Sequence, residues 1–139
     1  MDLEAFESYR RFDDRGEFWG LGRKAFADAA KALLGRHRDA RITIVVHETA
    51  YLEQRCPRLV ELLSLHGPRL HVLRTEPSVR SYSRGFVIAD ATVVLRRPHF
   101  DGSRVFVDFD ETAVGGAANL FADLAGSALP GISSGVTGL

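Results

Sequence analysis

The run Arg-Ile-Thr-Ile-Val-Val-His at residues 41–47 constrains the fold of this chain more than any other segment. It is rich in β-branched residues, which favour strands, and its centre is apolar on both faces. A strand with two apolar faces is typical of the interior of a sheet that is covered on both sides. The run therefore predicts a layered domain in which helices pack on both faces of a sheet.

Helical and strand patterns alternate around this run. Apolar residues recur at helical spacing over residues 18–34, and Pro57 suits the first turn of a helix that Gly67 and Pro68 would end. Residues 70–76 have the pattern of a second short strand. Residues 5–12 mix apolar and polar side chains and predict an edge strand or an irregular arm. The alternation of helix and strand indicates an α/β domain.

From residue 81 onward the pattern changes to short strands. Three strand-like runs follow one another with short connections, at residues 81–89, 92–99 and 104–109. Asp101 and Gly102, between the last two runs, are typical of a tight hairpin. We therefore expect one mixed β-sheet with helices packed on its faces.

A final helix is expected after Asp110, whose side chain suits an N-cap, with Glu111 in the first turn. The pair Gly115-Gly116 near the start of this helix indicates a close approach to the sheet. Residues 126–139 contain several Gly and Ser residues and predict a flexible C-terminal tail. The expected organisation is one domain over residues 1–125 followed by that tail.

Composition narrows the class of protein. The 139 residues carry 18 basic and 18 acidic side chains, and this zero net charge removes the field that usually marks a nucleic-acid-binding or membrane-surface protein. No apolar run approaches the roughly 18 residues that a membrane span requires. The single cysteine, Cys56, favours a reducing compartment, and the acidic start lacks the pattern of a signal peptide. We expect a cytoplasmic protein that binds neither nucleic acid nor membranes.

Arginines are concentrated in the middle of the chain. Residues 74–107 hold six arginines and three acidic residues, whereas residues 108–139 hold four acidic residues and no basic one. Arg84 falls near the mouth of one expected strand, and Arg96 and Arg97 fall late in the next. Guanidinium groups at the ends of strands can bind a phosphate group through paired hydrogen bonds. These three arginines are the candidate anion-binding site. The alternative is that they form surface ion pairs, with Glu76, Asp101 or Asp108 as partners.

Two further motifs have both a functional and a structural interpretation. The run Gly20-Leu-Gly22-Arg-Lys-Ala25 matches a dinucleotide-binding loop, but no apolar strand directly precedes it, so closely packed glycines in a helix are expected instead. Asp108, Asp110 and Glu111 have oxygens that suit a divalent cation, although carboxylates at a helix N-terminus are equally expected to cap it. Helix capping is the interpretation we favour, and we expect no metal site.

Two single residues, His47 and Cys56, are also candidates for catalytic groups. His47 ends the most buried strand, where α/β proteins often place functional residues, although a hydrogen-bonded structural histidine is the simpler expectation. Cys56 precedes a helix, but no base accompanies it, so a small buried side chain is expected. The motifs therefore assign no catalytic residue and no cofactor.

The run Ser83-Arg-Gly-Phe-Val-Ile-Ala-Asp90, followed by Ala-Thr-Val-Val-Leu-Arg-Arg-Pro98, resembles one half of the phospholipase D-like fold, as does the expected order of strands and helices. The signature of that superfamily is His-x-Lys, four residues and Asp. On this chain the Asp falls on Asp90, but Ser83 stands at the His position and Gly85 at the Lys position. In the superfamily the His takes the phosphoryl group and the Lys binds its oxygens. The resemblance therefore implies a phospholipase D-like half-domain that lacks the catalytic pair.

Residues 18–125 are also similar to an uncharacterised bacterial domain family of this fold, which occurs alone or behind acetyltransferase domains of the GNAT type. The resemblance implies a homodimer, because two halves face each other across one site in active relatives, and it implies an acetyltransferase-type partner. We expect a non-catalytic domain with a binding or regulatory role, whose ligand is an anion such as a phosphate-bearing small molecule.

Two alternatives stay open at the level of sequence. One is a phosphodiesterase or phosphohydrolase with a non-standard active site, in which His47, His71 or His99 acts as acid or base. The other is a structural module for dimerisation or for binding a partner protein. Turnover of phosphoester substrates distinguishes the first alternative, and light scattering distinguishes the second.

Overall fold

The computed structural model describes residues 8–13, 16–17 and 20–132. Within them, seven strands form one mixed sheet in the order β6-β5-β4-β1-β2-β3-β7. The strands are β1 (Ser8–Asp13), β2 (Arg41–Val46), β3 (Leu70–Arg74), β4 (Gly85–Ala89), β5 (Val93–Arg97), β6 (Phe106–Asp108) and β7 (Leu129–Ile132). The helices are α1 (Lys24–Arg36), α2 (Ala50–Arg55), α3 (Pro57–His66), the short 3-10 helix η2 (Pro77–Val79) and α4 (Glu111–Gly126). The expected α/β class is confirmed.

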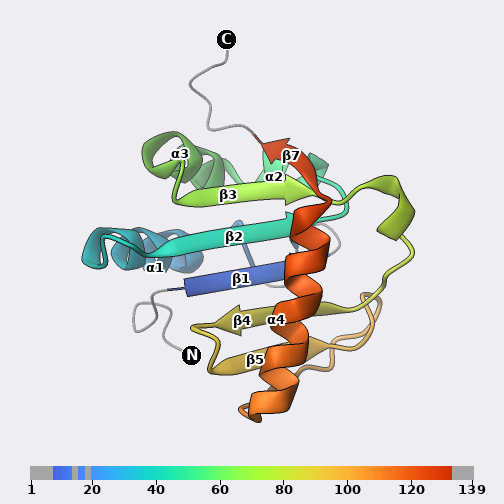
Figure 1. The fold of residues 1–139 in the computed structure, drawn as a ribbon. Coiled ribbons are helices and arrows are strands. Elements are labelled where there is room, and N and C mark those ends of the chain that lie inside the picture. Colours follow the sequence, from blue (N-terminus) through green and yellow to red (C-terminus); the bar gives the residue numbers. More distant parts are fainter. Residues whose placement is uncertain (1–7, 14–15, 18–19, 133–139) are drawn as a thin grey trace.

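Strand β1 lies in the middle of the sheet and joins its two halves (Figure 1). It pairs in parallel with β2 on one side and antiparallel with β4 on the other. The expectation of an edge strand or irregular arm at residues 5–12 is therefore wrong for residues 8–12, and residues 5–7 lie outside the described residues. The prediction failed because backbone pairing on both sides places this strand inside the sheet, although the segment is not apolar throughout.

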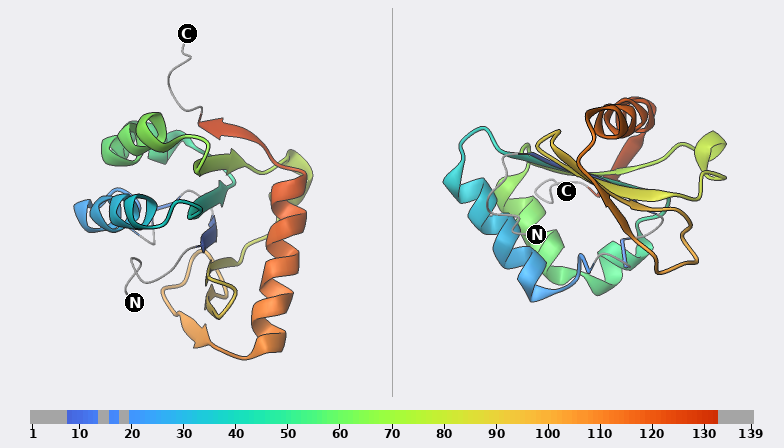
Figure 2. Two further views of the ribbon diagram at one scale, coloured as in Figure 1. Left: turned by 60° about the vertical axis from the view of Figure 1, so that its left-hand side comes forward. Right: turned by 90° about the horizontal axis from the view of Figure 1, so that it is seen from below.

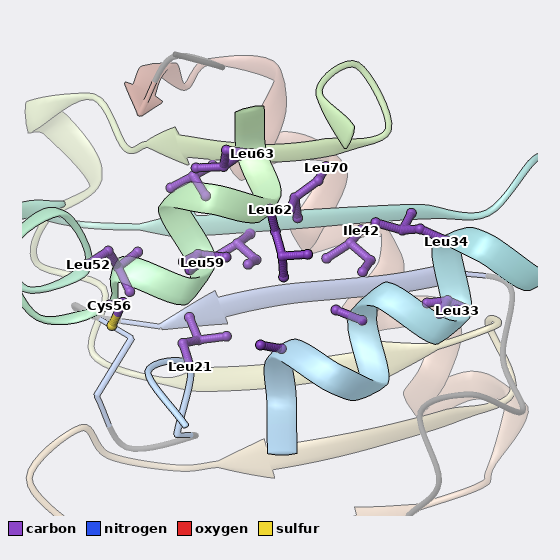
Figure 3. Packing of buried hydrophobic residues seen from close by; sticks show 14 of the residues in the cluster. Leu21, Leu33, Leu34, Ile42, Leu52, Cys56, Leu59, Leu62, Leu63 and Leu70 are labelled. Atoms are coloured by element: carbon purple, nitrogen blue, oxygen red, sulfur yellow. The ribbon is translucent and has the colours of Figure 1, made fainter. Parts of the chain in front are cut away.

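Helices cover both faces of the sheet, as the run at residues 41–47 predicts. Helices α1, α2 and α3 lie on one face, and α4 lies on the other (Figure 2). Ile42 and Ile44 of β2 belong to the core under the first three helices, whereas Val45 belongs to the core under α4. All three side chains are fully buried. The first core consists largely of leucines (Figure 3): Leu21, Leu33, Leu34, Leu52, Leu59, Leu62, Leu63 and Leu70.

Helix α1 begins at Lys24, six residues later than the pattern over residues 18–34 predicts. A turn occupies the expected first part, in which Gly20 adopts a positive φ of 74° and its carbonyl accepts a hydrogen bond from Arg23 N. A Cβ on Gly22 would lie 3.1 Å from Cys56 Sγ, so this glycine permits a close approach to the junction of α2 and α3. Gly22 therefore packs closely, as expected, whereas Gly20 provides the positive φ of the turn, and both glycines lie before the helix rather than inside it.

The helix expected from Pro57 to Gly67 is confirmed as α3, and the strand expected at residues 70–76 is confirmed as β3, which is two residues shorter. Helix α2 was not predicted. Its six residues are too few to show a helical repeat of apolar positions, and only Leu52 in it is buried.

The three strands expected at residues 81–89, 92–99 and 104–109 are β4, β5 and β6, and each is shorter than expected. Strand β4 begins at Gly85 rather than at residue 81, because Tyr82 N donates to Val79 O in a turn that continues from η2. The tight hairpin lies between β4 and β5, where Asp90 and Ala91 have positive φ angles of 51° and 57°. The turn at Asp101 and Gly102 exists as well, but within the longer loop of residues 98–105.

Helix α4 confirms the expected N-cap, because the Asp110 side chain accepts a hydrogen bond from Ala113 N. The helix extends to Gly126, and residues 129–132 then form β7, which pairs antiparallel with β3. The expectation of a flexible tail from residue 126 is therefore wrong for residues 129–132, which form a strand. Residues 133–139 lie outside the described part of the chain. Pro130 and Gly131 concealed this strand because both are rare in strands, but β7 is an edge strand, where such residues are tolerated.

A substitution in β7 tests whether this strand is an integral part of the sheet. A Cβ on Gly131 would lie 2.8 Å from Val72 O, and a backbone oxygen cannot move aside without disturbing β3. Gly131→Ala should therefore lower the free energy of unfolding by about 1–3 kcal/mol in urea denaturation. Gly126→Ala is the control, because a Cβ there meets no atom within 4 Å. Equal stability of both variants would show that β7 does not dock as described.

Candidate functional site

The candidate site lies where the parallel strands of the sheet end. We call this side of the sheet its carboxyl edge, which differs from the outer strands β6 and β7. Strands β1, β2 and β3 are parallel and end at this edge, and the register places the start of β4 and the end of β5 beside them. Helix α4 crosses the sheet near the same edge (Figure 1). In open α/β sheets, ligands bind outside the carboxyl ends of parallel strands. A ligand site is therefore expected at this edge on general grounds.

A groove of about 550 Å³ opens there between α4 and the strands β4 and β5. We call it the α4 groove. It is lined by Tyr82, Arg84, Gly85, Phe86, Arg96, Arg97, Pro98, His99, Phe106, Thr112, Ala113, Gly116, Ala117 and Leu120. The three arginines expected to bind an anion thus all reach one groove, whose remaining lining is largely apolar.

Small residues of α4 leave the space for this groove. Ala113, Gly116 and Ala117 form the helix side of the groove, and a Cβ on Gly116 meets no atom within 4 Å. The same is true of Gly115. The expectation that Gly115-Gly116 marks a close approach to the sheet is therefore wrong. The two glycines border open space, and Gly116 widens the groove.

Arg84 lies in the segment just before β4, and its side chain is exposed. It is close enough to Tyr82 to affect the titration of the phenol. Burial raises the pKa of Tyr82 above its ordinary value of 10.0, and the positive charge of Arg84 opposes that rise. Arg84 therefore presents a solvated guanidinium at the mouth of the α4 groove, beside a half-buried aromatic ring.

Arg96 shares a face of the sheet with two aromatic residues. It is the register partner of Phe86 in β4 and of Phe106 in β6, and all three line the α4 groove. Its Nη2 lies 3.3 Å from Asp108 Oδ2, and its side chain is 51% exposed. This ion pair with Asp108 is one of those expected if the arginines do not bind an anion. Such an exposed pair contributes only about 0–1 kcal/mol, so a ligand anion can compete with it at little cost.

Arg97 differs from the other two arginines because its side chain is buried, with 7% of its surface exposed. Its Nε donates to Gly102 O at 2.8 Å, and its Nη2 donates to Phe100 O. The guanidinium also lies 5.9 Å from the centre of the Phe100 ring. These contacts hold the loop between β5 and β6 in place. Arg97 therefore contributes the shape of the groove wall.

His47 supports the structural interpretation. Its Nε2 lies 2.7 Å from Tyr82 O, and its Nδ1 lies 2.7 Å from Thr75 Oγ1. A carbonyl oxygen only accepts, so Nε2–H donates to it, and in the neutral ring Nδ1 accepts from the threonine hydroxyl. The ring also packs edge-on against Phe12 and Phe100. Both nitrogens are used within the fold, and His47 ties the segment before β4 to the ends of β2 and β3.

The positions of the degenerate phospholipase D-like motif do not come together. Ser83 precedes β4 and Asp90 follows it, so a whole strand of about 17 Å separates them. Gly85 is buried at the start of that strand. Of the other two candidate histidines, His99 lines the α4 groove, whereas His71 lies near the start of β3, at the opposite edge of the sheet.

The carboxylates before α4 serve structure. Asp108 Oδ1 accepts from Asp110 N and its Oδ2 pairs with Arg96, while Asp110 caps the helix. The capping interpretation is thus confirmed. Cys56 is fully buried, as expected. Within the described residues, no group of three or more His, Cys, Asp or Glu side chains could hold a metal ion, and no helix is long and apolar enough to cross a membrane.

A second hollow, of about 620 Å³, lies beside α2 and is lined by Glu17, Glu48, Ala50, Tyr51, Gln54 and Arg55. It is the larger of the two, but two carboxylates and one guanidinium line it. The α4 groove differs because three arginines and no carboxylate line it, together with Tyr82, Phe86 and Phe106. The alternation expected along residues 81–89 puts Tyr82 and Phe86 on the same face as Arg84, but only the strand register shows that Phe106 of β6 lies beside them.

The fold and this groove define an α/β domain with one candidate ligand site. Residues 14–114 match the family described as Domain of unknown function (DUF7931), which covers most of the chain. The chain belongs to that family. The matched region includes the arginines and aromatic residues of the groove, but it ends within the first turn of α4. No curated protein and no solved structure matches the chain.

The titration of Tyr82 tests the electrostatics of the groove. Arg84→Gln removes a positive charge that stabilises the phenolate, so the pKa of Tyr82 should rise further above 10.0. Carbon NMR of labelled tyrosine measures this, and Tyr82→Phe assigns the signal among the three tyrosines. Arg80→Gln is the matched control and should leave the pKa unchanged. An unchanged or lower pKa in Arg84→Gln would place Arg84 away from the phenol.

Proposed function

We propose that this protein is a non-catalytic binding domain whose α4 groove holds a small amphipathic anion. The observation that carries the proposal is the position of Arg84 and Arg96 on an otherwise largely apolar groove. A guanidinium binds phosphate, sulfonate or carboxylate groups with paired hydrogen bonds. Tyr82, Phe86 and Phe106 offer a surface for the apolar part of such a ligand.

The two arginines have different roles in this proposal. Arg84 is exposed and supplies the first contact with the anionic group. Arg96 is held by Asp108 in the free protein and turns to the ligand when the anion replaces the carboxylate. Arg97 does not contact the anion, because Phe100 O and Gly102 O already accept from its guanidinium. The expected site of three arginines therefore becomes two ligand contacts and one positioning residue.

We also propose that the domain is a phospholipase D-like half-domain in which the chemistry is absent. The order of elements supports this: two parallel βα units lead into antiparallel strands and a final helix on the opposite face. Ser83 and Gly85 at the His and Lys positions favour binding over phosphodiester cleavage. The two hydrogen bonds of His47 favour the same conclusion, since a general base needs a free nitrogen.

A fluorescent aromatic anion tests the groove directly. We expect 8-anilinonaphthalene-1-sulfonate to bind with increased fluorescence and Arg84→Ala to weaken this binding about tenfold at low salt, because one charge-assisted hydrogen bond contributes about 1.5–3 kcal/mol. The difference should shrink at about 0.5 M salt, where exposed charges are screened. Arg80→Ala is the control. Equal affinity of both variants at low salt would remove Arg84 from the site.

Filling the groove tests its location independently of charge. Gly116→Leu places a side chain in the space that the groove occupies and should lower affinity for the same probe at least tenfold. Gly115→Leu is the matched control, because it lies on the same helix with the same open space but does not line the groove. Both variants should keep or gain stability, since leucine favours helices by about 0.5–1 kcal/mol over glycine. Equal loss of binding in both variants would contradict the assignment.

A further inference from the structure

The two outer strands of the sheet, β6 and β7, differ in how well they are protected against pairing with another chain. Strand β7 forms one edge, and its Pro130 lacks an N–H group and discourages further pairing. Within the part of the chain that the structure describes, strand β6 forms the other edge and pairs only with β5. It contains neither proline nor lysine. Its second side therefore offers backbone N–H and C=O groups to another strand.

Large apolar side chains are exposed along this open edge. Phe106 is 44% exposed, Val107 55% and Phe109 73%. They lie in or directly after β6, the orange strand at the lower end of the molecule in the left view of Figure 2. Single exposed apolar residues are ordinary. Several of them along an edge strand, which has one side open for pairing, mark a surface that pairs with another chain.

We propose that a second copy of this chain pairs with β6 in antiparallel fashion, centred on Val107. Residues opposite each other in such a pair point to the same face of the sheet, so the register must be centred on a residue. Centring on Val107 sets Val105 opposite Phe109 of the second copy, and Arg104 opposite its Asp110. Val105, Val107 and Phe109 then cover one another on one face, Phe106 lies opposite Asp108 of the second copy on the other face, and opposite charges meet at both ends of the pair.

The charges are the reason to choose a second copy over a different partner. Arg104 and Asp110 are both exposed and flank the apolar segment on its two sides, so the edge is complementary to itself. A register centred on Asp108 would instead oppose two like charges, which destabilises a strand pair. Asp110 caps α4 through Oδ2, and a carboxylate has room for a second donor.

The symmetry of this pair has a structural consequence. A two-fold axis perpendicular to the sheet at Val107 keeps both α4 helices on the same face and joins two seven-stranded sheets into one of fourteen strands. Phe106 lines the α4 groove and also lies in the paired strand. The two grooves would therefore open on the same face, on either side of the junction.

Light scattering during size-exclusion chromatography tests the pairing, with the full chain at several concentrations. The wild-type protein should elute with twice the mass of 15.3 kDa at high concentration. Val107→Lys places a charge on the axis and should shift the mass to that of the monomer. Its circular dichroism spectrum should match that of the wild type, since Val107 is exposed in the single chain, and only the wild type should gain thermal stability with concentration. A wild-type monomer at all concentrations, or a dimer that survives Val107→Lys, would overturn the proposal.

Cross-linking tests the register. Opposite residues in an antiparallel pair have Cα atoms about 4.5–5.5 Å apart, which suits a disulfide. Val107→Cys should therefore form a disulfide-linked dimer with oxidised glutathione as oxidant. Leu65→Cys, which is also exposed but lies on α3, should not. No cross-link at Val107, or equal cross-linking of both variants, would contradict the register. These outcomes do not depend on ligand binding in the α4 groove.

Discussion

The pairing of β1 with both β2 and β4 is the constraint on which the rest of the structure depends. It unites a parallel half with an antiparallel half: α1, α2 and α3 lie on one face of the sheet, and α4 crosses both halves on the other face. Phe12 of β1 is fully buried at this junction. Its ring packs against the rings of His47, Tyr82, Phe86 and Phe100, which come from both halves. The aromatic cluster thus fixes the edge of the sheet from which the groove opens.

The α4 groove follows from this arrangement. Tyr82 and Phe86 contact Phe12 and also line the groove, so the core and the ligand site share side chains. His47 holds the backbone of Tyr82, and Arg97 holds the loop that contains Phe100. His47 and Arg97 are engaged in these structural bonds, so the exposed Arg84 and the weakly paired Arg96 are the cationic side chains left to meet a ligand, beside His99 and Thr112 of the same lining.

Sequence patterns predicted those parts of the fold that depend on local chemistry. The interior strand at residues 41–47, helix α3 after Pro57 and the Asp110 cap are each visible in a few consecutive residues. The central position of β1 and the existence of β7 depend on pairing with distant strands, and hydropathy does not show that pairing. The same holds for the arginines. The sequence pattern correctly predicted that all three lie near the ends of neighbouring strands. Only the conformation of the loop after β5 shows that Arg97 is buried.

An NMR titration of the isotope-labelled protein with phenyl phosphate tests the central claim most directly, because it locates an amphipathic anion without assuming where it binds. Binding in the α4 groove should concentrate the shifts on backbone and side-chain signals of Arg84, Phe86, Arg96 and Gly116, with smaller changes in the rings around Phe12. Shifts that instead concentrate on Glu48 and Tyr51 beside α2, or no saturable shifts at all, would contradict it.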